Sequence, residues 1–354
     1  MSDRDKQLHA WADHAVRSAW RGTHVARTDA LRGDMSTRRF WRLHLEGKAA
    51  PASAILIDLG PDDLPGYARI LKLVPEPVKE PPWLTVHAFL DKLGAPVPAM
   101  YALDRKHRAM LVEDVGEVSL VDAARAQPAE TAHLFRDAVS LLLSLHVDGT
   151  RALPSDLLPA TIAYDARLFR WEFKEFLELG CAMLNADPDA LIPELDRLTD
   201  ELGKLPRVFS HRDFHGQNLF VQLIADKPRL RVIDFQDALM APSAHDLAVL
   251  LTTRDMADLI SPALERRLID FYYAGLARRN AVTLNADEFL RSYELCVMQH
   301  AIKMMGRFLM FERNGKTGYA GFVPYTIAQT RRILSGKLKN HFPRLAQTFG
   351  EAPR

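Results

Sequence analysis

A strongly polar segment interrupts an apolar, strand-like region of this chain, and no other feature constrains its fold as much. The segment VFSHRDFHGQNLFV, residues 208–221, brings His211, Asp213 and Asn218 within eight positions. A second apolar run follows and ends at Asp234, in the sequence VIDFQD. Polar side chains gathered between strands either cap a turn or form a site that binds or acts on charged groups. The fold must therefore bring strands together so that this segment lies in a loop.

The rest of the chain shows two different patterns. Residues 30–115 contain short runs rich in β-branched and aromatic residues, separated by Gly, Pro and Asp turns, with one helix expected at 83–93. Most of the remaining chain repeats its apolar residues at helical spacing, for example over 131–146. We therefore predict an α+β fold with two lobes, a small β-rich lobe at 1–113 and a mostly helical lobe at 114–354 that carries the polar segment.

The same patterns predict the individual elements. A first helix is expected at 7–20, and Asp165 is expected to cap the helix that follows it. Strands are expected in the small lobe at 40–45, 54–57 and 110–112, and around the polar segment at 207–210, 218–223 and 229–234.

The composition excludes several classes of protein. Of the 354 residues, 48% are hydrophobic and 26% charged, with a formal net charge of +1, so nothing favours a nucleic-acid partner or an anionic membrane surface. We recognise no signal peptide and no bilayer-spanning stretch, and two cysteines form no disulfide framework. We expect a cytoplasmic protein with a small-molecule substrate and no nucleic-acid or membrane partner, while its oligomeric state stays open.

The polar segment has the spacing of a catalytic loop. HRD at 211–213 is followed by Asn218, and an apolar run then leads to DF at 234–235, as in kinase-type phosphotransferases. Phosphoryl transfer needs an oriented acceptor hydroxyl and neutralised phosphate charge. We therefore predict that Asp213 is the catalytic carboxylate. Mg²⁺ prefers hard oxygen ligands, which makes Asn218 and Asp234 the predicted metal ligands.

The alternative is an ordinary polar turn in which Asp213 and Asn218 are caps. The bare pattern H-x-D-x-x-x-x-N arises by chance in about one chain in a hundred, but flanking strands and the later D-F make such a match much rarer. The catalytic interpretation is therefore favoured. In it, His211 packs beneath the loop and bonds to the backbone, and Asp246 braces the loop.

Longer stretches resemble a known family. SHRDFHGQNLFV, VIDFQDALMAPSAHDLAVLL and the two-lobe pattern resemble the aminoglycoside phosphotransferase-like (choline kinase-like) superfamily, which has a protein-kinase-like fold. Four further stretches, GDMSTRRFWRL, MLVEDVG, QHAIKMMGRF and GKTGYAGFVP, are similar to the anomeric N-acetylmuramate/N-acetylglucosamine kinases of peptidoglycan recycling. The resemblance implies a phosphotransferase that uses ATP and Mg²⁺ to phosphorylate the anomeric hydroxyl of such a sugar.

The resemblance also implies a nucleotide site between the lobes. Adenine would bind backbone groups of the hinge near Glu113 and Val115. The turn that contains Ser36 and Thr37 would lie over the phosphates with its N–H groups, and Arg38 would add positive charge.

One feature departs from the protein-kinase pattern. The strand-like run SAILIDLG lacks the lysine with which protein kinases hold the α- and β-phosphates. Arg38, Arg39, Lys48 and Lys72 are the candidates to replace it. If none does, the chain would be a degenerate kinase.

The acceptor site is expected in the helical lobe, where Glu172, His215 and Lys303 are predicted to contact the substrate. His300, Lys303 and Arg307 follow one another at steps of three and four and so share one helix face. Such a cationic face suits a neutral or anionic sugar better than a polycationic aminoglycoside.

Two other functions stay open at this point. One is an aminoglycoside kinase or another small-alcohol (choline-like) kinase. The other is a non-catalytic pseudokinase that senses a nucleotide or sugar, which the missing lysine supports and the retention of Asp213, Asn218 and Asp234 opposes.

Overall fold

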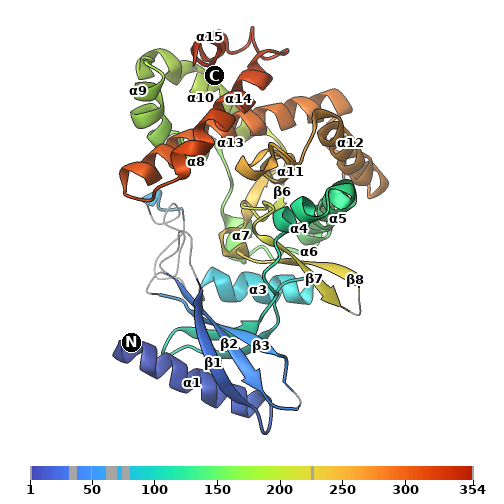
Figure 1. Ribbon diagram of the computed structural model, residues 1–354. Coiled ribbons are helices and arrows are strands. Elements are labelled where there is room, and N and C mark those ends of the chain that lie inside the picture. The colour runs from blue at the N-terminus through green and yellow to red at the C-terminus, as the bar shows by residue number, and fades with distance from the viewer. Residues whose placement is uncertain are drawn as a thin grey trace.

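The N-terminal part of the computed structural model is an antiparallel sheet covered by a helix (Figure 1). The structure describes residues 2–31, 38–48, 50–60, 70–73, 80–224 and 227–352. The five strands pair in the order β1-β2-β3-β5-β4. They are β1 (His24–Leu31), β2 (Arg39–Glu46), β3 (Ser53–Asp58), β4 (Met100–Asp104) and β5 (Ala109–Glu113). The sequence predicted β2, β3 and β5, whereas the more polar β1 and the short β4 were missed.

Helix α1 (Asp3–Ala19) supplies one side of the small core. Ser2 and Asp5 form a capping box that satisfies N–H groups at its start. Leu8 and Val16 are completely buried on its apolar face, in one cluster with Leu56 of the sheet. The helix predicted at 7–20 is thus confirmed and begins one turn earlier, because the cap precedes the apolar pattern.

Helix α3 (Pro82–Lys92) lies between the sheet and the helical part (Figure 1). Its buried Val86 and Leu90 belong to the large core of the helical part rather than to the core of the sheet. His87 lies against Phe235, with ring centroids 5.8 Å apart. The helix therefore connects the sheet to the segment that follows Asp234, although it precedes the predicted lobe boundary.

The remainder is mostly helical, which confirms the predicted α+β class, and no described helix has the length and apolar character needed to cross a membrane. Two small sheets pair β6 (Arg207–Ser210) with β9 (Leu239–Pro242) and β7 (Leu219–Ile224) with β8 (Lys227–Val232). The α-helices are α4 (Leu120–Ala126), α5 (Thr131–Ser144), α6 (Thr150–Ala152), α7 (Leu158–Thr161), α8 (Ala166–Trp171), α9 (Cys181–Met183), α10 (Pro188–Lys204), α11 (His245–Thr252), α12 (Pro262–Arg278), α13 (Ala286–Arg313), α14 (Val323–Leu334) and α15 (Pro343–Glu351).

Helix α13 runs through the large core and approaches a π-turn, η3 (Phe176–Gly180), very closely. The approach is possible because Gly306 has no side chain. A Cβ added there would lie 2.2 Å from the backbone N of Phe176. Since backbone atoms cannot move aside as a flexible side chain can, this glycine fixes how α13 packs.

Gly306→Ala is therefore expected to lower the free energy of unfolding by about 3 kcal/mol through overpacking. Gly350→Ala is the matched control, because Gly350 lies in α15 with nothing within 4 Å of its added Cβ. That variant should be neutral or gain up to about 1 kcal/mol from helix propensity. Urea denaturation of both variants measures the difference, and equal stabilities would contradict the packing described here.

His300, also on α13, is an uncharged histidine in the core. Only 7% of its surface is exposed, and neither ring nitrogen has a hydrogen-bond partner among the described residues. Burial, followed by the positive charges of Lys303 and His245, lowers the pKa of His300 from 6.5 to about 3, although Asp213 and Glu172 act in the opposite direction. Protonation of this side chain therefore favours the unfolded state.

Stability should consequently fall with acidity. Because the folded-state pKa of His300 lies below the unfolded value, its effect is absent above pH 6.5 and grows as the pH falls below that value. Between pH 7 and 5 the wild type should lose about 2 kcal/mol that His300→Gln does not lose. Urea denaturation at several pH values tests this, with His133→Gln at an exposed position of α5 as the control. Parallel pH profiles of wild type and His300→Gln would contradict it.

Candidate active site

The loop after β6 is held by one buried carboxylate. The backbone N–H groups of His211 and Arg212 donate to Asp246 at 2.7 and 3.0 Å, and Ser210 Oγ donates to it at 2.8 Å. Arg212 has a left-handed backbone with φ of 75°, a conformation that costs energy in a non-glycine residue. Asp246 therefore fixes an otherwise unfavourable turn directly before Asp213, as the sequence predicted for a bracing residue.

Asp246 stays charged although it is completely buried. Burial alone would raise its pKa, but hydrogen bonds with His146 and His245 hold the pKa well below its usual range. His146 lies 3.1 Å from one carboxylate oxygen and 2.6 Å from the hydroxyl of Tyr272 on α12. No local sequence signal marks His146 or Tyr272, because His146 reaches Asp246 from a distant helical segment and Tyr272 contacts His146 from another.

The structure brings the catalytic loop and the segment around Asp234 together. Ile233 N–H donates to the carbonyl of Asn218 at 3.1 Å, and the Asn218 side chain donates through Nδ2 to the carbonyl of Asp213 at 2.9 Å. Ring Nε2 of buried His211 lies 3.0 Å from the carbonyl of Ile233. The predicted role of His211 beneath the loop is thus confirmed.

Three carboxylates also interact in this region. Burial, together with the negative charges of Asp213 and Asp234, raises the pKa of Asp237 to about 6, although Arg212 and Arg38 act in the opposite direction. Arg212, 3.3 Å from Asp237, and Arg38, 3.1 Å from Asp234, offset part of this negative charge. The predicted catalytic and metal residues therefore share one electrostatic site.

Asp234 has a left-handed conformation, with φ of 64°, directly after β8. One of its oxygens accepts hydrogen bonds from Arg38 Nη2 at 3.1 Å and from Gln236 Nε2 at 2.8 Å. Arg38 begins the segment that leads into β2, so this contact joins the sheet to the helical part. Of the basic residues considered as replacements for the strand lysine, Arg38 is thus the one placed at the predicted metal ligand.

The other candidates lie elsewhere. Arg39 pairs with Asp58 at 2.8 Å and with Asp5 at 2.6 Å, and Lys48 and Lys72 are exposed. Ser36 and Thr37, predicted to contact the nucleotide, lie outside the described residues.

Side-chain contacts tie the end of β5, at the predicted hinge, to neighbouring segments. Glu113 accepts a hydrogen bond from Ala99 N at 3.0 Å and pairs with Arg231. Val115 is buried, and neither its N–H nor its carbonyl bonds to another described residue. The Val115 backbone therefore offers one donor and one acceptor of the kind that a purine edge requires.

Glu172 lies in a buried ionic network beside the loop. It is completely buried, and one oxygen accepts from Arg212 Nη2 at 2.9 Å and lies 3.0 Å from Lys303 Nζ. Its other oxygen accepts from Tyr164 and from Gln299. Burial would raise the pKa of Glu172, but the charges of Lys303 and Arg212 lower it far below its usual range. These contacts favour a role in holding two cations, while the predicted contact with an acceptor stays a prediction.

His215 and Lys303 are the other residues predicted at the acceptor. His215 is half-buried in the loop, with Nε2 at 3.3 Å from Asn218 Nδ2. Lys303 is buried and faces the network of Glu172. Asp165 caps α8 by accepting from Leu168 N at 3.0 Å, as predicted.

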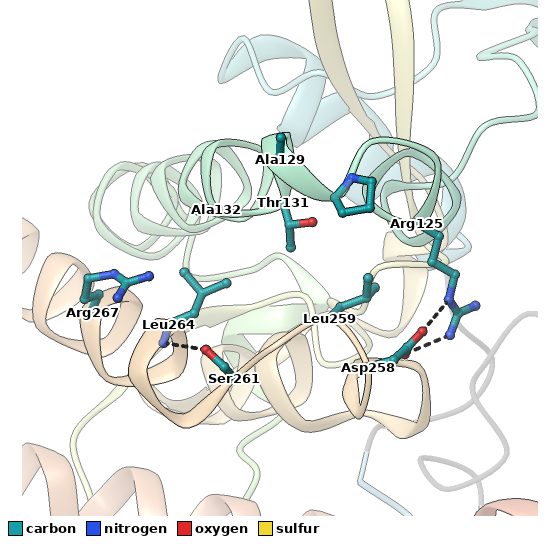
Figure 2. A pocket seen from close by; sticks show the side chains of 10 residues that line it. Arg125, Ala129, Thr131, Ala132, Asp258, Leu259, Ser261, Leu264 and Arg267 are labelled. Atoms are coloured by element: carbon teal, nitrogen blue, oxygen red, sulfur yellow. Dashed lines mark hydrogen bonds and ion pairs between the residues drawn. The ribbon is translucent and has the colours of Figure 1, made fainter.

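A separate cavity of about 350 Å³ lies between α4, the start of α5 and the start of α12 (Figure 2). Arg125 and Asp258 form an ion pair at one side of it, with Nε and Oδ2 3.1 Å apart. None of its lining residues belongs to the catalytic loop or to α13. The cavity is therefore distinct from the site predicted around Asp213.

Comparison with known sequences identifies the family of this chain. The sequence model of the phosphotransferase enzyme family (APH) matches residues 30–282. The N-acetylmuramate/N-acetylglucosamine kinase of Pseudomonas putida is 26% identical over 344 residues, which cover 94% of this chain and 92% of that protein. The kinase of the same name from Caulobacter vibrioides is 28% identical over 327 residues, covering 84% and 85% of the two chains. The predicted resemblance to amino-sugar kinases is thus confirmed.

Solved structures show the same fold. A choline kinase from Cryptosporidium parvum has a TM-score of 0.61 at 12% identity and covers 96% of this chain and 99% of its own. The aminoglycoside phosphotransferase APH(2'')-Ib has a TM-score of 0.55 at 13% identity, with coverages of 98% and 99%. These likenesses confirm the predicted bilobal, kinase-like fold. The chain belongs to the APH phosphotransferase enzyme family and is a kinase, as the spacing of its catalytic loop predicts.

Proposed function

We propose that this kinase uses ATP and Mg²⁺ to phosphorylate the anomeric hydroxyl of N-acetylmuramate and N-acetylglucosamine in the cytoplasm. The observation that carries the proposal is the shared electrostatic site of Asp213, Asn218 and Asp234. It occurs in a chain that aligns over 94% of its length with a relative bearing that substrate name.

Asp213 would act on the acceptor hydroxyl. Burial alone would raise its pKa, but the positive charges of Arg212 and Lys303 hold the pKa below its usual range. The carboxylate is therefore ionised at neutral pH. It can accept a hydrogen bond from the hydroxyl and take its proton as the new bond to phosphorus forms.

Asn218 and Asp234 fit a magnesium ion by the chemistry of their donors. Among the described residues no three His, Cys, Asp or Glu side chains cluster as a metal site, but Mg²⁺ often takes only one or two protein carboxylates and keeps several waters. Nδ2 of Asn218 is used within the loop, so Oδ1 is the atom left for a metal. Bound Mg²⁺ and ATP would supply the phosphoryl group and neutralise its charge.

The nucleotide would bind between lobes at 1–113 and 114–354. The backbone of Val115 would hold the purine edge beside Glu113, and Arg38 would bind phosphate with its planar fork. In support, related folds have been solved with AMP and with ADP. Ser36 and Thr37 keep their predicted place in the phosphate-binding turn.

The cationic side chains near Asp213 favour an amino sugar over the alternatives. Arg212 and Lys303 are the positive charges that act most strongly on Asp213, and they would repel a polycationic aminoglycoside or a choline-like cation. The pseudokinase alternative has less support, because Arg38 reaches Asp234 and offers a replacement for the missing lysine.

Asp213→Asn tests this proposal directly. The amide keeps the shape of the side chain but cannot take a proton, so kcat with N-acetylglucosamine should fall by about 100- to 10,000-fold. Binding of ATP, measured by calorimetry, should change by less than about threefold, since Asp213 acts on the acceptor.

Asp165→Asn is the matched control for Asp213→Asn. Asparagine caps a helix as well as aspartate does, so α8 and the activity should both be retained. Full activity of Asp213→Asn, or absence of turnover by the wild type with every amino sugar tried, would overturn the proposed function.

A further inference from the structure

A short turn beside the catalytic loop carries an arginine that the proposed chemistry does not use. This 3-10 turn, η5 (Arg254–Met256), packs against the loop, because a Cβ added to Gly216 would lie 3.6 Å from Met256 Cε. Arg254 therefore lies next to the loop that holds Asp213.

Aromatic rings hold the Arg254 side chain in place. Its guanidinium lies 4.9 Å from the ring centroid of Phe322 and 5.5 Å from that of Tyr319. Both rings belong to η6 (Tyr319–Phe322), and Phe322 packs on Phe308 of α13 with centroids 5.5 Å apart. Cation–π contacts of this kind fix the plane of a guanidinium without using its N–H groups.

The N–H fork of Arg254 is open to a ligand. Asp255 lies 3.4 Å from Nε, and the described parts of the chain offer no other polar contact to this side chain. The side chain is 22% exposed, so solvent reaches it. Other arginines near the loop differ, because Arg212 is bound to Glu172 and Arg307 lies 3.7 Å from Glu175.

A small, mostly apolar cavity extends from Arg254 to α13. Its wall includes His300, Tyr325 and Gln329. The two buried nitrogens of His300 have no partner among the described residues, and buried polar atoms normally find one. The cavity measures about 10 Å³, which admits one water or one small polar group. A ligand bound by Arg254 could therefore reach His300 only with the tip of a substituent or through a water.

We propose that Arg254 binds a carboxylate on a side arm of the acceptor sugar, so that this subsite recognises the acid that N-acetylmuramate carries and N-acetylglucosamine lacks. The inference rests on the proposed function and adds to it the residue that recognises the acidic side arm. The acid of N-acetylmuramate is attached through O3, away from the anomeric hydroxyl. A residue that binds this acid must lie beside the catalytic loop, as Arg254 does. A planar guanidinium can bind both oxygens of a carboxylate at once.

The test compares three acceptors in wild type and Arg254→Gln: N-acetylmuramate, its neutral methyl ester and N-acetylglucosamine. The variant should lose about 10- to 100-fold in kcat/KM for N-acetylmuramate, the value of a charged hydrogen-bonded pair. The loss should occur mainly in KM, and the ester and N-acetylglucosamine should change by less than about threefold. In the wild type, kcat/KM for the methyl ester should be lower than kcat/KM for N-acetylmuramate by the same factor.

Two variants separate this effect from a general disturbance. Arg254→Lys keeps the charge but not the fork and should recover part of the preference for the acid. Arg125→Gln removes an arginine that pairs with Asp258 and should leave all three acceptors unchanged. Equal losses for acid and neutral acceptors, or no loss for the acid, would overturn the role of Arg254 while leaving the proposed function intact. Absence of turnover with any of the acceptors would overturn both.

Discussion

The active site depends on the carboxylate of Asp246. It is buried, charged and completely enclosed, and it accepts two backbone N–H groups from the turn that precedes Asp213. A carboxylate that receives several hydrogen bonds in a dry environment holds its partners strongly, because no water competes for them. The turn at Arg212 has an unfavourable left-handed backbone, and the hydrogen bonds to Asp246 offset its cost. The position of the predicted catalytic carboxylate, Asp213, is thus set from α11 and not from the loop itself.

A second buried acid organises the charge around Asp213. Glu172 holds Arg212 and Lys303, and these same two cations lower the pKa of Asp213. Positive charge near a carboxylate keeps it ionised but also weakens it as a base. Under the proposed function, such a base would suit a hydroxyl that is already acidic, and an anomeric hydroxyl is more acidic than an ordinary alcohol. This balance agrees with a sugar acceptor at its anomeric position.

The sequence predicted those parts of the fold that depend on local pattern. Helices α1 and α3, strands β2, β3 and β5, and the loop with Asp213 and Asn218 all follow from periodicity or spacing. Strand β1 was missed because polar residues occur on both of its faces, as is possible at the edge of a sheet. Lys303 and Glu172 were placed near the site, but their mutual pairing depends on packing between α13 and the segment after α8. His146 and Arg254 were beyond prediction, because nothing in their neighbourhoods marks them.

The central claim is that Asn218 and Asp234 share one divalent cation beside Asp213. Crystals grown with Mn²⁺ in place of Mg²⁺ and a non-hydrolysable ATP analogue test it most directly, since Mn²⁺ is located by its anomalous scattering. We predict a peak bound by Asn218 Oδ1 and Asp234, with a phosphate oxygen of the nucleotide as a further ligand and the Arg38 fork turned to the phosphates. A bound nucleotide whose metal lies away from both side chains, or Asp234 still paired only with Arg38 and Gln236, would contradict the account.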